Sequence, residues 1–347
     1  MPEAEIIPID GRGQPGPNRC RATTRDGKRC KRQSVGLSGF CRTHGGREET
    51  RAEATEKARR KTTRARVEES STDPVERLRN FFARRLAGSY AIDDFGFDEE
   101  LYRNILMPIA RPLYEDYFRV KTIGMDRIPS DGPALLVGNH SGTIPLDAVM
   151  LQHAVASEHP EHRIIRNTGA NLVWSTPFIS SLARKSGNVV ACDEDAFELL
   201  RRGELVGVFP EGFKGVGKGW KNRYRLQRFG RGGFIEVALR SKVPIIPVAI
   251  VGAEETYPMI ADVRPLAKAL GFPYFPITPT FPLLGPLGLI PLPSKWIIEF
   301  GEPIAMEDYP DDAADDAMLV FDLTDSIRDT IQQMLITNLR LRKGTFS

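Results

Sequence analysis

The chain has 347 residues, of which 41% are hydrophobic and 27% are charged, enough for one large globular domain with appendages. No run of 18 or more apolar residues is free of helix breakers, which excludes a transmembrane helix; the nearest candidate, 272–293, contains seven prolines. The net charge of +3 is unevenly divided, because residues 19–66 hold 16 Lys or Arg against 5 Asp or Glu and the remainder is acidic.

Changes in composition along the chain predict five segments. Residues 1–18 are rich in Gly and Pro without an apolar period, which predicts disorder. Residues 19–46 contain a Cys/His cluster, and 47–73 form a basic linker without the large apolar side chains that a core needs. Helices are expected over 74–120, and the main α/β domain over 121–345.

The cluster in 19–46 consists of Cys20, Cys30, Cys41 and His44. Three thiolates and one imidazole complete a tetrahedral zinc set, and closed sites of this kind are structural; free thiols in a basic tail are the alternative. The segment is similar to a small Cys/His module appended to varied bacterial and phage proteins. Its basic charge suits an anionic membrane surface, with nucleic acid left open as a partner.

The first helical segment is basic and amphipathic. Over 74–90, Phe81 and Phe82 lie opposite four arginines, a pattern typical of a helix on anionic lipid. Packing of the same apolar face into a core is the alternative. Residues 272–293 are a second candidate for membrane contact, as a proline-stiffened loop that dips into lipid or walls an acyl chain; a buried extended segment covering the sheet is the other interpretation.

Short apolar runs alternate with helical ones in the main domain. Strands are predicted over 134–138, 163–166, 187–191, 205–209, 244–251 and 296–300, and helices over 146–154, 196–202 and 232–240. Such alternation predicts an α/β fold whose functional residues lie on loops at strand ends.

One strand end carries the residues best suited to chemistry. The strand over 134–138 is followed by Asn139 and His140, then by small residues, a proline and Asp147. An imidazole can remove a proton from an attacking hydroxyl near neutral pH, and a carboxylate on its other ring nitrogen would fix the tautomer. His140 is therefore the candidate base with Asp147 as its partner. Taken alone, the pair could equally be a turn histidine and a helix N-cap.

Two later segments decide between these interpretations. Phe-Pro-Glu-Gly occupies 209–212, and Val-Pro-Ile-Ile-Pro-Val occupies 243–248. Together with 139–147 they resemble, in the right order, the glycerolipid acyltransferase family that includes lysophosphatidic acid acyltransferases. The resemblance covers about 120–305 and implies a mixed sheet flanked by helices.

The resemblance also implies an activity and its partners. A fatty acyl group would pass from acyl-CoA or acyl carrier protein to a hydroxyl of a lysophospholipid, lysophosphatidic acid or acylglycerol. Neither an enzyme nucleophile nor a cofactor is needed for this transfer. Glu211 would help bind the acceptor head, and Gly212 would allow close approach of the backbone. A cytoplasmic protein peripheral to the inner face of the cell membrane is expected.

Two departures from the family pattern stand out. His140 and Asp147 are separated by six residues rather than four, so the loop must bulge, for instance at Gly142 and Pro145; this variant resembles the branch grouped with mono- and diacylglycerol acyltransferases. The second family block, 187–193, lacks the Arg that pairs with an acceptor phosphate. A basic run could replace that Arg or could face an anionic membrane, and it comprises Lys214, Lys218, Lys221, Arg223, Arg225 and Arg228.

Backbone N–H groups at Ser141 and Gly142 are the candidate donors to the oxyanion that forms on the thioester carbonyl. Cys192 has no neighbouring pattern that would activate it as a nucleophile. Two other functions remain open: a zinc-dependent nucleic-acid-binding protein with an inactive acyltransferase-like body, and a thioester hydrolase in which His140 activates water.

Overall fold

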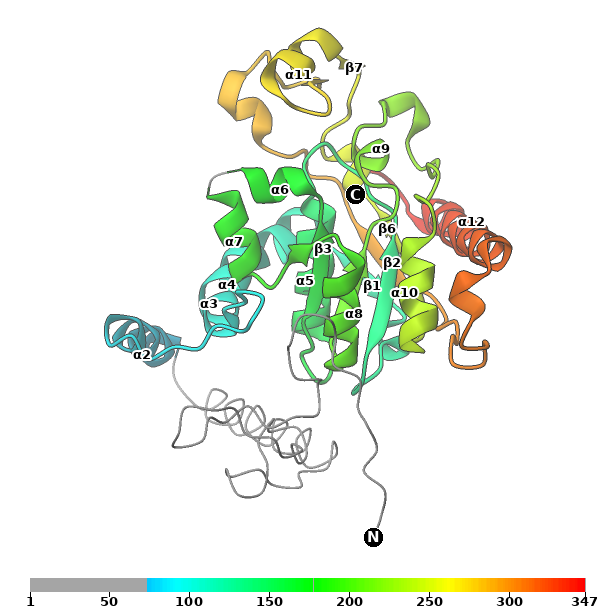
Figure 1. The fold of residues 1–347 in the computed structure, drawn as a ribbon. Coiled ribbons are helices and arrows are strands. Elements are labelled where there is room, and N and C mark those ends of the chain that lie inside the picture. Colours follow the sequence, from blue (N-terminus) through cyan, green and yellow to red (C-terminus); the bar gives the residue numbers. More distant parts are fainter. Residues whose placement is uncertain (1–73, 177, 347) are drawn as a thin grey trace, which may run out of the picture. The chain divides into compact units, whose positions relative to one another are not determined.

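The computed structural model describes residues 74–176 and 178–346. The chain divides into two units, residues 1–83 and 84–347, and Figure 1 shows the sheet of the second unit with its helices. The predictions for 1–18, for the Cys/His cluster and for the linker lie outside the described residues. Helix α2 (Pro74–Leu86) begins the described part, and the sheet and its covering helices all belong to the second unit.

The second unit is built on a mixed sheet. Within the described residues seven strands join it in the order β1-β9-β6-β2-β5-β3-β4, and all neighbouring pairs are parallel except β6 with β9. The strands are β1 (Lys121–Ile123), β2 (Ala134–Gly138), β3 (Ile165–Gly169), β4 (Val189–Val190), β5 (Leu205–Val208), β6 (Ile245–Val251) and β9 (Ile297–Phe300). The predicted α/β fold with a mixed sheet is confirmed.

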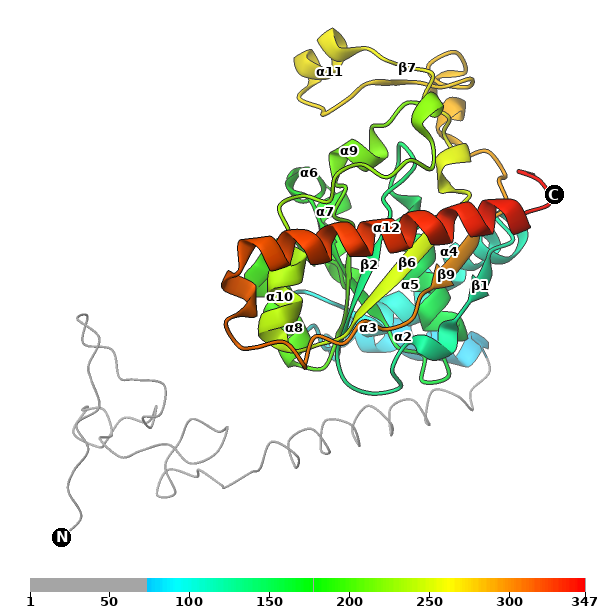
Figure 2. The same cartoon turned by 90° about the vertical axis from the view of Figure 1, so that its right-hand side faces the viewer.

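Helices cover both faces of this sheet, because each central strand is apolar on both sides. Leu135 and Val137 of β2 face a core shared with α8, α10 and α12, whereas Ala134 and Leu136 face one shared with α5 and with 99–117. Figure 2 shows α12 lying across the sheet. The helices are α3 (Glu99–Leu101), α4 (Met107–Pro112), α5 (Leu146–Glu158), α6 (Asn171–Ser175), α7 (Ile179–Lys185), α8 (Asp193–Arg201), α9 (Phe213–Val216), α10 (Gly233–Ser241), α11 (Arg264–Leu270) and α12 (Ala317–Leu341).

The order of the three central strands positions the candidate site. β2 lies between β5 and β6 and is parallel to both, with Leu135 opposite Val206 and Ile245. Parallel neighbours end at the same edge of a sheet, so the loops after β2, β5 and β6 emerge side by side.

Between β6 and β9 the chain leaves the sheet. This excursion contains β7 (Ala261–Asp262), α11, β8 (Pro276–Ile277) and a 3₁₀ helix, Gly285–Leu289. In Figures 1 and 2 alike, α11 and β7 lie beyond α9, away from the sheet. The interpretation of 272–293 as a buried segment is wrong, because the Leu283 side chain is 83% exposed and that of Leu287 is 66% exposed. None of the described helices combines the length and the apolar character needed to cross a bilayer.

Candidate active site

The loop after β2 is anchored at its first residue. The side-chain amide of Asn139 is fully buried; its Nδ2 donates to the Ile250 carbonyl at 3.0 Å and its Oδ1 accepts from the Ile250 N–H at 2.7 Å. Both bonds go to Ile250 of β6, so the side chain of Asn139 continues the pairing of β2 with β6 beyond the end of β2. His140, the next residue, therefore starts from a fixed backbone position.

Six residues separate His140 from Asp147, and the structure brings the two side chains together. His140 Nδ1 lies 2.8 Å from Asp147 Oδ2, and the carboxylate is fully buried. Gly142 makes the required turn with φ of +83°, a conformation that suits glycine, and α5 begins one residue before Asp147. His140 also stacks on Phe209 with ring centroids 4.8 Å apart. The ring is thus held by a hydrogen bond on one side and by an aromatic face on the other.

Asp147 organises the loop as well as the imidazole. Its Oδ2 accepts from the Ser141 N–H at 2.8 Å, and its Oδ1 accepts from the Ala148 N–H at 2.9 Å. The Ser141 amide, one of the two candidate oxyanion donors, is therefore already in use inside the loop. The Gly142 amide has no acceptor within the described part of the chain, and neither has the buried Ser141 hydroxyl.

Glu211, in the loop after β5, is an internal group in this structure. Its side chain has no solvent exposure, and its oxygens accept from the His140 N–H at 3.0 Å and from the Gln227 N–H at 2.7 Å. Lys218 Nζ approaches the same carboxylate at 3.3 Å. A buried carboxylate needs such donors, and here they come from the loop after β2 and from the segment between α9 and α10.

Lys218 lies between two acids. Its Nζ is 3.3 Å from Glu211 Oε2 and 3.0 Å from Glu254 Oε1, and its side chain is only 5% exposed. Glu254 follows β6 and also accepts from the Tyr224 N–H at 2.8 Å. Burial raises the pKa of Glu254 to about 7, against the opposing effect of Lys218. One lysine thus serves two buried carboxylates, and Glu254 holds its proton far more tightly than an exposed Glu.

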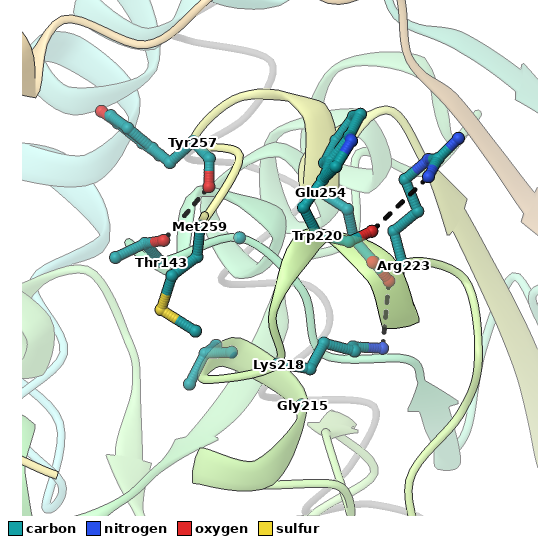
Figure 3. Close-up of a pocket in the computed structure, with 10 residues that line it drawn as sticks. Thr143, Gly215, Lys218, Trp220, Arg223, Glu254, Tyr257 and Met259 are labelled. Atoms are coloured by element: carbon teal, nitrogen blue, oxygen red, sulfur yellow. Dashed lines mark hydrogen bonds and ion pairs between the residues drawn. The ribbon is translucent and has the colours of Figure 1, made fainter. Parts of the chain in front are cut away.

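A small pocket opens beside the His140 loop (Figure 3). Arg223 is exposed, and its guanidinium lies over the Trp220 ring at 4.4 Å from the centroid. The Thr143 hydroxyl donates to the Tyr257 carbonyl on the opposite side. The lining combines two cations, one acid, two aromatic rings and smaller or apolar residues, and it comprises Gly142, Thr143, Gly215, Val216, Lys218, Trp220, Arg223, Glu254, Tyr257 and Met259.

The remaining basic residues and glycines of this region differ in their surroundings. Lys214 is exposed on α9, and Lys221, Arg225 and Arg228 are exposed or partly exposed in the segment that comes after it. Gly212 has a φ of +54°, and no atom lies within 4 Å of the position that a Cβ would take; its N–H donates to the Phe209 carbonyl. No group of three or more metal-ligating side chains occurs among residues 74–176 and 178–346.

Sequence reasoning did not find Glu254. Its position directly after β6 is the signal that could have found it, because β6 neighbours the strand that carries His140. The sequence places Glu254 in a Glu-Glu pair shortly after a glycine, a pattern more typical of an exposed turn.

A substitution at Gly215 tests whether the loops after β2 and β5 must approach each other closely. A Cβ at this position would lie 2.5 Å from the His140 carbonyl oxygen and 2.8 Å from Glu211 Cβ. We expect Gly215→Ala to lower the free energy of unfolding by about 1–3 kcal/mol, although alanine favours helices more than glycine does. Gly219→Ala is the matched control, because its nearest neighbour would lie 3.7 Å away. Equal stability of the two variants in urea denaturation would contradict the close approach.

The raised pKa of Glu254 predicts that the free energy of unfolding depends on pH. Its pKa is about 7 in the folded protein against 4.5 for the ordinary side chain, so the folded state binds the proton more tightly. The stabilisation is complete below the unfolded pKa and is lost as the pH rises through 7. Between about pH 5.5 and pH 8 this loss amounts to roughly 2 kcal/mol. In urea denaturation the wild type should lose more stability over this range than Glu254→Gln; parallel pH profiles would exclude a raised pKa.

The chain is similar in sequence to known proteins. The acyltransferase family matches residues 119–251, which include the loops carrying His140, Asp147 and Glu211. An uncharacterized protein of Mycobacterium tuberculosis is 52% identical over 272 residues, which is 78% of this chain and 76% of the relative. A human protein named DGAT1/2-independent enzyme synthesizing storage lipids is 29% identical over 163 residues, covering 46% of this chain and 49% of that protein.

Among solved structures, the chain is similar to the 1-acyl-sn-glycerophosphate acyltransferase PlsC of Thermotoga maritima. The identity is 17% and the TM-score is 0.44, covering 69% of this chain and 82% of the other. The protein belongs to one family with its mycobacterial relative and contains, over residues 119–251, a domain of the acyltransferase family.

Proposed function

We propose that this acyltransferase moves a fatty acyl group from a thioester, acyl-CoA or acyl carrier protein, to a hydroxyl group of a glycerolipid, with His140 as the general base. The pairing of the His140 ring with the buried Asp147 carboxylate carries the proposal. The family match supports acyl transfer in general. The name of the human relative, which refers to storage lipids, supports an acylglycerol or a related lipid as acceptor.

The reaction proceeds by direct attack. His140 Nε2, which has no hydrogen-bond partner among the described side chains, takes the proton from the acceptor hydroxyl. The acceptor oxygen adds to the thioester carbonyl, and the tetrahedral intermediate collapses with release of the carrier thiolate. The imidazolium returns its proton to that thiolate. Asp147 keeps Nδ1 protonated and stabilises the imidazolium without itself taking the proton.

The residues around His140 supply a donor for the oxyanion and a cation for the acceptor head. The Gly142 N–H is the oxyanion donor, since the Ser141 N–H is occupied by Asp147. The acceptor head lies at the mouth of the pocket beside this loop, where Arg223 is an exposed cation stacked on Trp220. A guanidinium there can pair with a phosphate by two hydrogen bonds, which would replace the Arg missing from 187–193.

Glu211 and Lys218 have a positioning role in this mechanism. Both are buried and paired within the protein. Their role is therefore to hold the His140 loop in place beside the pocket, not to bind the lipid. Lys214 and Gly212 remain candidates for contact with the acceptor or with the phosphates of coenzyme A, because Lys214 is exposed and the space where Gly212 would carry a Cβ is open.

The proposal is tested by product analysis with the full chain. Labelled palmitoyl-CoA and palmitoyl carrier protein are each incubated with lysophosphatidic acid, other lysophospholipids, monoacylglycerol, diacylglycerol or no acceptor. We expect a labelled lipid with at least one acceptor and little free palmitate, because the base is set to activate a hydroxyl in the pocket. Free palmitate released at the same rate without any acceptor would identify a thioester hydrolase instead. No turnover with any pair would exclude the proposed function.

A further inference from the structure

The excursion between β6 and β9 exposes an unusual amount of apolar surface. We call residues 260–290 the apolar arm. Its exposed large side chains are Ile260, Leu266, Leu270, Phe272, Leu283, Leu284, Leu287, Leu289 and Ile290. Isolated exposed leucines are normal in soluble proteins, but a concentration of this kind within one short segment marks an interaction surface.

The charge on the apolar arm is mainly positive. Residues 260–290 contain Arg264 and Lys268 against one acid, Asp262, whose Oδ2 lies 3.7 Å from Arg264 Nε. Arg264 is 90% exposed, and Lys268 is exposed on the same helix. Apolar side chains flanked by cations match the two components of an anionic lipid surface, acyl chains below and negative head groups above.

The inner side of the arm is tied to the catalytic loop. The Tyr274 hydroxyl donates to the Thr143 carbonyl at 2.6 Å, and Thr143 lies three residues after His140. Beneath the arm, the Tyr257 hydroxyl donates to the Leu289 carbonyl at 2.6 Å. A surface bound to the outer side of the arm would therefore lie on the same side of the sheet as the candidate acceptor pocket.

We propose that the apolar arm docks this protein on an anionic lipid bilayer, with the Gly285–Leu289 turn inserted among the acyl chains and Arg264 and Lys268 at the head groups. If the proposed function holds, docking by this surface brings a membrane-resident acceptor to the side of the molecule that carries the pocket. The inference concerns binding alone, so it can hold or fail independently of acyl transfer.

Insertion is tested with tryptophan reporters in the full chain. Leu287→Trp is placed on the arm, and Met318→Trp is the matched control on α12, since the two native side chains are 66% and 69% exposed. Vesicles contain phosphatidylcholine with phosphatidylglycerol whose acyl chains carry bromine. We expect a blue shift and quenching of the added tryptophan for Leu287→Trp but not for Met318→Trp. An unshifted and unquenched Leu287→Trp at saturating lipid would overturn the proposal.

A second measurement distinguishes lipid binding by the arm from lipid binding by the basic residues 19–66. In high salt, where interactions between exposed charges are screened, vesicle co-sedimentation is compared for wild type, Leu283→Ser/Leu287→Ser and the control Met318→Ser/Phe321→Ser. We expect the arm variant to partition at least about tenfold more weakly than the other two, because two exposed leucines no longer enter lipid. Equal partitioning of all three would contradict docking by the arm, as would an arm-dependent dimer that binds no lipid.

Discussion

The arrangement of the site depends on the hydrogen bonds and the ion pair of the buried Glu211 carboxylate. An isolated charge at this depth would cost many kcal/mol, and the donors that offset this cost come from the His140 amide, the Gln227 amide and Lys218. Removing any of these donors would leave the charge underpaired, so the loops that supply them are held together. Glu211 acts on His140 through the backbone, while Asp147 acts through the ring. The backbone and the ring of His140 are therefore both held by the protein itself, as its proposed role as a proton acceptor requires.

Lys218 also connects Glu211 with a second buried acid, Glu254. Lys218 supplies one positive charge to two buried acids, and the raised pKa of Glu254 relieves the excess negative charge by retaining a proton. Close to the pocket this leaves Arg223 as an exposed cation whose partners within the protein are an aromatic ring and a carbonyl. The charges inside the site are thus paired within the protein, whereas the Arg223 guanidinium at its rim is exposed.

Much of the fold could be predicted from local pattern. The strand predicted over 134–138 agrees with β2, and 205–209 and 244–251 fall within one residue of β5 and β6, because buried parallel strands are continuous apolar runs. β3 lies two residues later than predicted, and the 25-residue helix α12 was missed. The His140–Asp147 pairing could be proposed from sequence, since Asp147 lies in the first turn of the helix that directly follows the His140 loop. The internal position of Glu211 and Lys218 could not, because it depends on the order β5-β2-β6 and on Glu254 from a third loop.

The role of His140 as the base is tested most directly by transfer kinetics of the full chain. Rates of labelled palmitoyl transfer to the preferred acceptor are measured for wild type, His140→Ala and Asp147→Asn, with circular dichroism and thermal unfolding as controls for the fold. We predict that His140→Ala remains folded and loses about 10²–10⁴-fold in kcat, with a smaller loss for Asp147→Asn. A folded His140→Ala variant that transfers acyl groups at the wild-type rate would contradict this role.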